Sequence, residues 1–177
     1  MSGQEFISFC CSSTMQLPLI MDSNDICTSD TGIIDYFIQY MKTKYKINIV
    51  AWEPSSCAYP NYMFLGGDRG ILAYISFRYI HSPSSITPDD ISWKSKEVLK
   101  TVRVASSQLD RPVFYVYLIN TADRIGIFFE TDEQIRDRWL STDFSSDIYT
   151  PVTAEMGDFQ NLLSILLDLK RNSVKVS

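Results

Sequence analysis

The stretch YPNYMFLGGDRGILAYISFRYI, Tyr59–Ile80, decides the fold class that we predict for this chain. Two apolar runs flank the segment Gly66-Gly67-Asp68-Arg69-Gly70, whose glycines accept positive φ and favour a tight turn. The second run alternates in polarity, which is typical of a strand with two different faces. One face would carry Ile71, Ala73, Ile75 and Phe77, and the other would carry Leu72, Tyr74, Ser76 and Arg78. The stretch therefore predicts a β-hairpin.

Helices and strands are predicted on both sides of the hairpin. The segment Gly32–Tyr45 has apolar residues at helical spacing, and Ile47–Trp52 has the composition of a short strand. Residues 81–90 predict a loop, and Thr87-Pro88 starts a helix that we expect to reach about Leu109. Two further strands are expected at Val113–Ile119 and Arg124–Glu130. The first of these is apolar throughout, which is typical of a strand buried on both faces.

The two ends of the chain are expected to differ in secondary structure. Residues 1–30 predict a short strand followed by a loop, whereas Thr131–Gln134 opens a short helix that ends near Trp139. The segment Asp158–Lys170 predicts a helix that is apolar almost all round, which indicates deep burial or a subunit interface. The whole pattern predicts a single α/β domain, residues 1–177, with a mixed β-sheet flanked by helices.

Charge and composition narrow the classes of function. The 177 residues are 45% hydrophobic and carry a formal net charge of −5, with 21 Asp and Glu against 16 Lys and Arg. Any contact with nucleic acid would therefore need a local basic patch. We expect no membrane partner, because no apolar run reaches ~18 residues and no Lys or Arg precedes Lys42. Four cysteines without a CxxC motif and one histidine, His81, favour reduced thiols, no zinc site and a cytoplasmic location.

The hairpin resembles the core of the PD-(D/E)xK nuclease superfamily, which includes many restriction endonucleases. Pro60-Asn61 stands where that family has Pro-Asp, and Ser76-Phe77-Arg78 stands where it has Asp or Glu-x-Lys. A predicted helix with Asp35 precedes the hairpin, as an acid-bearing helix does in many members. The resemblance covers about residues 31–130 and implies a restriction-endonuclease-like core.

The matched positions lack the residues that metal-dependent cleavage requires. An active member holds Mg²⁺ with two carboxylates, whereas here the three positions are Asn61, Ser76 and Arg78. Their summed charge is positive, and a guanidinium neither loses its charge nor acts as a base. With a two-residue turn at Asp68-Arg69, Asn61 would lie opposite Ser76, and Arg78 would share their face. Such a trio binds an anion, or Arg78 lies at a sheet edge and binds nothing.

We therefore expect a catalytically degenerate nuclease-like domain that needs no cofactor. It would bind a protein partner or form a homo-oligomer, with nucleic acid as the other partner class. One alternative is an active Mg²⁺-dependent DNA or RNA endonuclease in which Asp35 and Glu53 have replaced the missing acids. Another is an unrelated small α/β interaction protein. Nucleic acid would contact Lys96, Lys100 and Arg103, which share a predicted helix face, whereas Lys42, Lys44 and Lys46 complement a helix C-terminus.

Overall fold

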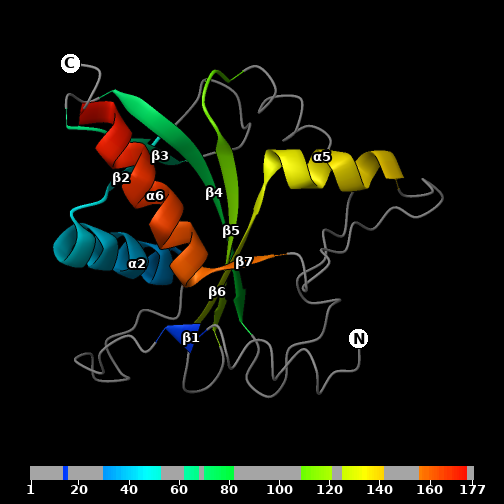
Figure 1. Ribbon diagram of the computed structural model, residues 1–177. Coiled ribbons are helices and arrows are strands. Elements are labelled where there is room, and N and C mark those ends of the chain that lie inside the picture. Colours follow the sequence, from blue (N-terminus) through cyan, green and yellow to red (C-terminus); the bar gives the residue numbers. More distant parts are fainter. Residues whose placement is uncertain are drawn as a thin grey trace.

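A mixed β-sheet forms the centre of the computed structural model, which describes residues 14–15, 30–52, 62–67, 70–81, 109–120, 125–141 and 156–174 (Figure 1). Its strands are β1 (Thr14–Met15), β2 (Asn48–Ala51), β3 (Tyr62–Leu65), β4 (Ile71–His81), β5 (Val113–Asn120), β6 (Ile125–Thr131) and β7 (Gly157–Asp158). They lie in the order β1-β6-β5-β4-β3-β2, and β7 pairs with β6. Strands β4 and β5 are parallel, and the other described pairs are antiparallel.

Three helices flank the sheet in the described residues: α2 (Asp30–Tyr45), α5 (Asp132–Ser141) and α6 (Phe159–Val174). Helices α2 and α6 cover one face of the sheet, and α5 lies on the other side (Figure 1). The predicted α/β class with a mixed, helix-flanked sheet is confirmed. The predicted loop begins one residue too early, because His81 is the last residue of β4. Residues 82–90 of that loop and almost all of the helix predicted up to Leu109 lie outside the described residues. None of the described helices is long and apolar enough to cross a membrane.

Strand β5 is buried on both faces, as its apolar sequence predicted. Every residue from Val113 to Ile119 is less than 5% exposed. Phe114, Val116 and Leu118 face the core under α2 and α6, which also contains the predicted helix residues Ile33, Ile34, Phe37, Ile38 and Met41. Val113, Tyr115, Tyr117 and Ile119 face the second core, together with Ile135 of α5. The strand therefore requires a covering layer on each side.

The hairpin forms in the predicted register, but a β-bulge changes its end next to the turn. Tyr62 pairs with Ile75 as expected, whereas Leu65 pairs with Ile71 because the register shifts after Phe64. Leu72 is the extra residue, and it packs on the α2 side together with Ala73. The prediction that Ile71 shares a face with Ala73 is therefore wrong, since Ile71 packs on the opposite side. None of the described glycines has a positive φ, so the described glycines near this turn do not use the conformational freedom that the sequence offered.

Helix α6 is amphipathic rather than apolar all round. Phe159, Leu162, Leu163 and Leu166 are buried against the sheet, and the helix extends to Val174 rather than ending at Lys170. Ile165, Leu167 and Leu169 are half-buried beside the same core. Among the described residues, the one exposed large hydrophobic side chain is Val174. The helix is thus a covering layer for the sheet, and its apolar residues are already used within the chain.

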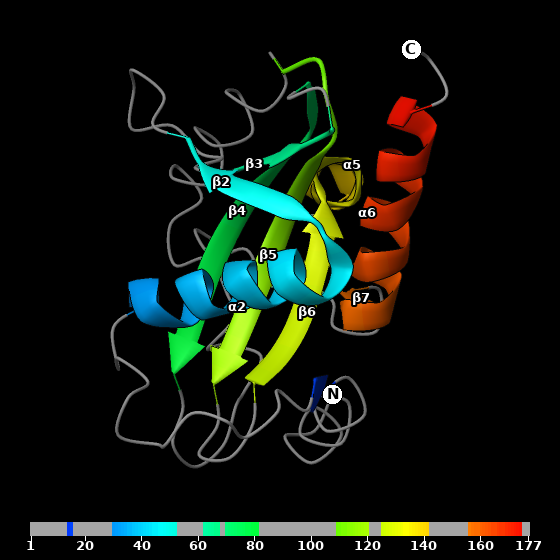
Figure 2. The same ribbon diagram turned by 90° about the vertical axis from the view of Figure 1, so that its left-hand side faces the viewer.

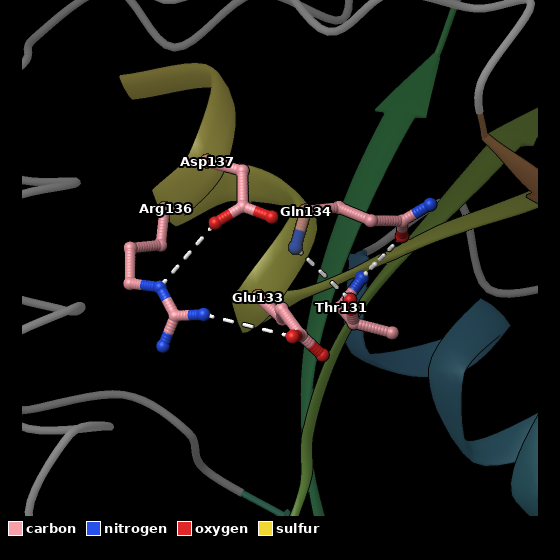
Figure 3. Close-up of polar contacts among 5 residues, drawn as sticks. All are labelled: Thr131, Glu133, Gln134, Arg136 and Asp137. Carbon is pink, nitrogen blue, oxygen red and sulfur yellow. Dashed lines mark hydrogen bonds and ion pairs between the residues drawn. The ribbon is translucent and has the colours of Figure 1, made fainter. Parts of the chain in front are cut away.

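Helix α5 begins at the predicted Thr131-Asp132-Glu133-Gln134 segment, which forms a reciprocal cap (Figure 3). The amide of Gln134 donates to the Thr131 hydroxyl at 3.1 Å, and the amide of Thr131 donates to the Gln134 side chain at 2.9 Å. These two bonds satisfy amide groups that a helix start leaves without partners. The helix therefore starts directly after β6 and carries Ile135 into the second core.

Gly157 provides a test of the β6–β7 contact. A Cβ at this position would overlap the ring of Phe129, which is 4% exposed and packs edge-on against Phe114 at 6.0 Å between centroids. We expect Gly157→Ala to lower the free energy of unfolding by about 1–3 kcal/mol, measured by urea denaturation. Gly67→Ala is the matched control and should change it by less than about 0.5 kcal/mol, because a Cβ there meets no atom within 4 Å. Equal losses in the two variants would contradict this account.

Candidate functional site

Two of the three motif positions, Ser76 and Arg78, lie on β4 and project from the same face of the sheet. This is the face of the second core, opposite α2 and α6. Ser76 is buried, with 3% of its surface exposed, and Arg78 is half-buried. Asn61 lies outside the described residues, although the register Tyr62↔Ile75 is the one that the predicted Asn61–Ser76 pairing required.

The neighbouring strands add polar side chains to this face. Ser76 pairs with Tyr115 of β5, and Tyr115 pairs with Glu130 of β6, so the three residues form a row across the sheet. Arg78 pairs in the same way with Tyr117. We call these five residues, Ser76, Arg78, Tyr115, Tyr117 and Glu130, the inner polar cluster. Four of the five are almost completely buried.

Glu130 is the residue of this cluster that sequence reasoning missed. Its side chain is 0% exposed, and its Oε2 accepts a hydrogen bond from the Tyr117 hydroxyl at 2.9 Å. Beside it, the Tyr115 hydroxyl donates to Oδ1 of Asp132 at 3.3 Å. A signal was present in the sequence, because Glu130 is two residues after Phe128 and thus in phase with an inward-facing side chain.

The cluster does not provide a set of ligands for Mg²⁺. Ser76 and Glu130 lie two strands apart, so their Cα atoms are about 10 Å from each other, with Tyr115 between them. Bound Mg²⁺ needs oxygen ligands at about 2.0–2.1 Å in an octahedral arrangement. Within the described part of the chain, no three Asp, Glu, His or Cys side chains are grouped so that they could hold a metal. The described residues of the cluster therefore do not form a magnesium site.

Asp35, one of the two acids considered as replacements, lies on α2 and is exposed. Helix α2 covers the face opposite the inner polar cluster, so the sheet separates Asp35 from Ser76 and Arg78 (Figures 1 and 2). Its carboxylate instead acts on Tyr62, whose pKa is raised first by burial and then by this negative charge. Glu53, Lys96, Lys100 and Arg103 lie outside the described residues.

On the cluster side of the sheet, Tyr74 precedes Ser76 by two residues along β4. Its ring contacts Trp52 at 5.0 Å between centroids, and its side chain is 6% exposed. Burial raises the pKa of Tyr74, the carboxylate of Asp110 raises it further, and Arg111 opposes this effect. The Tyr74 hydroxyl therefore remains neutral at ordinary pH.

The comparisons with known proteins do not place the chain in a family. No protein-family model, no curated protein and no solved structure matches it.

The Tyr117–Glu130 hydrogen bond is expected to contribute to stability. We expect Tyr117→Phe to lower the free energy of unfolding by about 1–3 kcal/mol, because it removes a donor from a buried carboxylate. Tyr115→Phe is the matched control, with an expected loss below about 1 kcal/mol, because its longer bond is to the half-buried Asp132, which water also reaches. Urea denaturation at neutral pH measures both. A larger loss in Tyr115→Phe would contradict the importance assigned to Glu130.

The raised pKa of Tyr62 predicts a loss of stability at high pH. Its ordinary value is 10.0, and the folded state raises it, so the folded protein binds the proton more tightly than the unfolded chain. This contribution is complete below the unfolded pKa and is lost as the pH rises through the folded pKa. We expect the free energy of unfolding to fall less between about pH 9 and about pH 11 in Tyr62→Phe than in the wild type. Asp35→Asn should reduce the difference in part, whereas an unchanged slope in Tyr62→Phe would contradict the raised pKa of Tyr62.

Proposed function

We propose that this chain is a nuclease-like domain that does not cleave nucleic acid and acts by binding a protein partner. The observation that carries the proposal is the chemistry of the inner polar cluster. Its positions matching the nuclease motif hold a buried serine and an arginine, and its carboxylate is fully buried and bonded to a tyrosine. The charges of Arg78 and Glu130 offset one another, so the cluster has no excess negative charge with which to attract Mg²⁺.

The order of the elements supports the nuclease-like part of the proposal. Helix α2 precedes the β3–β4 hairpin, and the chain then crosses over to β5, which lies parallel to β4. The resemblance implied this succession of a helix, a hairpin and a step into a further strand. Fold alone does not define a function, and an unrelated interaction protein with the same topology would have the same binding role.

The choice of a protein partner rests on charge. The net charge of −5 opposes long-range attraction to a nucleic acid. Self-association through α6 has less support than the sequence suggested, because the apolar residues of that helix are packed on the sheet within the chain. Recognition of a partner would then depend on charged surface residues rather than on a free apolar face.

A cleavage assay tests the proposal. The full chain is incubated with labelled DNA and RNA in Mg²⁺ or Mn²⁺, with EDTA as the control. We expect the substrates to remain intact, because the described residues of the cluster do not bring together three acidic, histidine or cysteine side chains that could hold a metal. The variants Asp35→Ala and Glu53→Ala identify the source of any cleavage that is observed. Cleavage that either variant abolishes would overturn the proposal in favour of an active nuclease with relocated acids. Metal-dependent cleavage that neither variant changes would overturn the proposal as well, and cleavage that persists in EDTA would show a metal-independent activity that also contradicts it.

A further inference from the structure

Five basic residues gather where α2 and α6 end. Lys42, Lys44 and Lys46 occupy the last turn of α2 and the residue after it, and Lys170 and Arg171 occupy the corresponding part of α6. The two segments are far apart in the sequence, but Nζ of Lys170 donates to the carbonyl oxygen of Lys46 at 2.7 Å. Figure 1 shows both helices ending on the same side of the molecule. We call these five residues the basic cluster.

The position of Lys46 is fixed by the way α2 ends. Lys46 has a φ of 57°, the left-handed conformation common just after a helix. Its amide donates to the carbonyl of Lys42 at 3.1 Å, and the amide of Ile47 donates to the carbonyl of Met41 at 3.2 Å. This pattern of bonds closes the helix end and directs the buried Ile47 into the sheet. The cluster is therefore built on rigid elements rather than on a loop.

No acid among the described residues neutralises the lysines of this cluster. Elsewhere in the described residues, Arg111 pairs with Asp110 at 4.0 Å, and Arg136 pairs with Glu133 at 3.6 Å and with Asp137 at 3.5 Å. In the cluster, Arg171 pairs with Asp168 at 3.0 Å. No described carboxylate lies within ion-pair distance of the four lysines. The cluster therefore keeps a clear positive charge on a chain whose net charge is −5.

The dipoles of two helix ends account for only part of this charge. Each helix C-terminus is equivalent to about −0.5 of an elementary charge, so about one cation would offset the two ends together. The contacts of the lysines leave their charges in place. Nζ of Lys44 donates to the Tyr40 hydroxyl at 2.9 Å and lies 5.2 Å from the centroid of the Tyr40 ring. This hydrogen bond is the largest of the effects that raise the pKa of Lys44. Lys46 donates to the carbonyl of Thr43 at 3.0 Å.

We propose that the basic cluster is the docking surface for an acidic segment of a protein partner. This inference rests on the proposed binding role and specifies the chemistry of the partner. A short run of Asp or Glu matches a small positive surface at the ends of two helices. An extended nucleic acid would also meet the acidic remainder of the chain, whose repulsion acts over a Debye length of about 8–10 Å. Attraction confined to the cluster therefore favours a short acidic ligand.

Fluorescence anisotropy with two labelled probes tests the inference. The probes are an oligoglutamate peptide and a duplex DNA, each titrated with the full chain at low and at physiological salt. We expect the wild type to bind oligoglutamate, with an affinity that falls as salt is added. The double variant Lys42→Gln/Lys44→Gln should raise the Kd about fivefold, because two exposed ion pairs with the peptide are lost. The double variant Arg111→Gln/Arg136→Gln removes the same charge outside the cluster and should change the Kd by less than about twofold.

Each contrary outcome gives the basic cluster a different role or none. Absence of oligoglutamate binding at low salt, or equal loss in the two double variants, would overturn the docking surface. Tighter binding to the duplex that depends on the cluster would assign the surface to nucleic acid instead. Self-association of the wild type that the cluster variant abolishes, measured by light scattering without probe, would assign it to a second copy of the chain. The cleavage assay is independent of these results, so failure here leaves the absence of cleavage untouched.

Discussion

The burial of β5 on both faces is the constraint on which the rest of the structure depends. A strand with seven consecutive buried residues, Val113–Ile119, must lie inside a sheet and must be covered on each side. Its parallel pairing with β4 requires a long crossover, which residues 82–112 supply. Helices α2 and α6 then cover one face, and α5 begins directly after β6 on the other side (Figure 2). The hairpin and the helices are thus arranged around one strand.

The same burial explains the form of the inner polar cluster. Polar groups that enter such a sheet lose their contact with water, so each needs a partner within the protein. The Tyr117 hydroxyl and the Glu130 carboxylate meet this need for one another, and the capped start of α5 brings Asp132 next to Tyr115. A catalytic metal site needs the opposite conditions, namely convergent carboxylates and access for a phosphate. The buried Tyr117–Glu130 hydrogen bond therefore fits a structural role within the sheet.

The residues that sequence reasoning placed correctly are those with a strong local signal. The spacing of Ile33, Phe37 and Met41 predicted α2, and the unbroken apolar run predicted β5. The bulge at Leu72 was not predictable, because alternation by itself carries no information about a register shift near a turn. Glu130 was missed because its partner, Tyr117, belongs to another strand, and only the β5–β6 register brings the two together. The sequence predicted α6 to be apolar almost all round because it does not distinguish half-buried apolar residues from fully buried ones. Ile165, Leu167 and Leu169 are the half-buried residues of this helix.

Net charge and local charge lead to different conclusions about partners, and the structure explains why. The net charge of −5 determines how the chain interacts with a distant charged molecule, for which the whole chain acts as one charge. Salt screens that field beyond about 8–10 Å. At contact distance, a partner meets individual side chains, and the ends of α2 and α6 present cations from two distant parts of the sequence. The bond from Lys170 to the carbonyl of Lys46 ties these ends together, so packing of α6 against the sheet also assembles the positive surface. Folding and recognition are therefore linked, because the surface exists only when both helices cover the same face of the sheet.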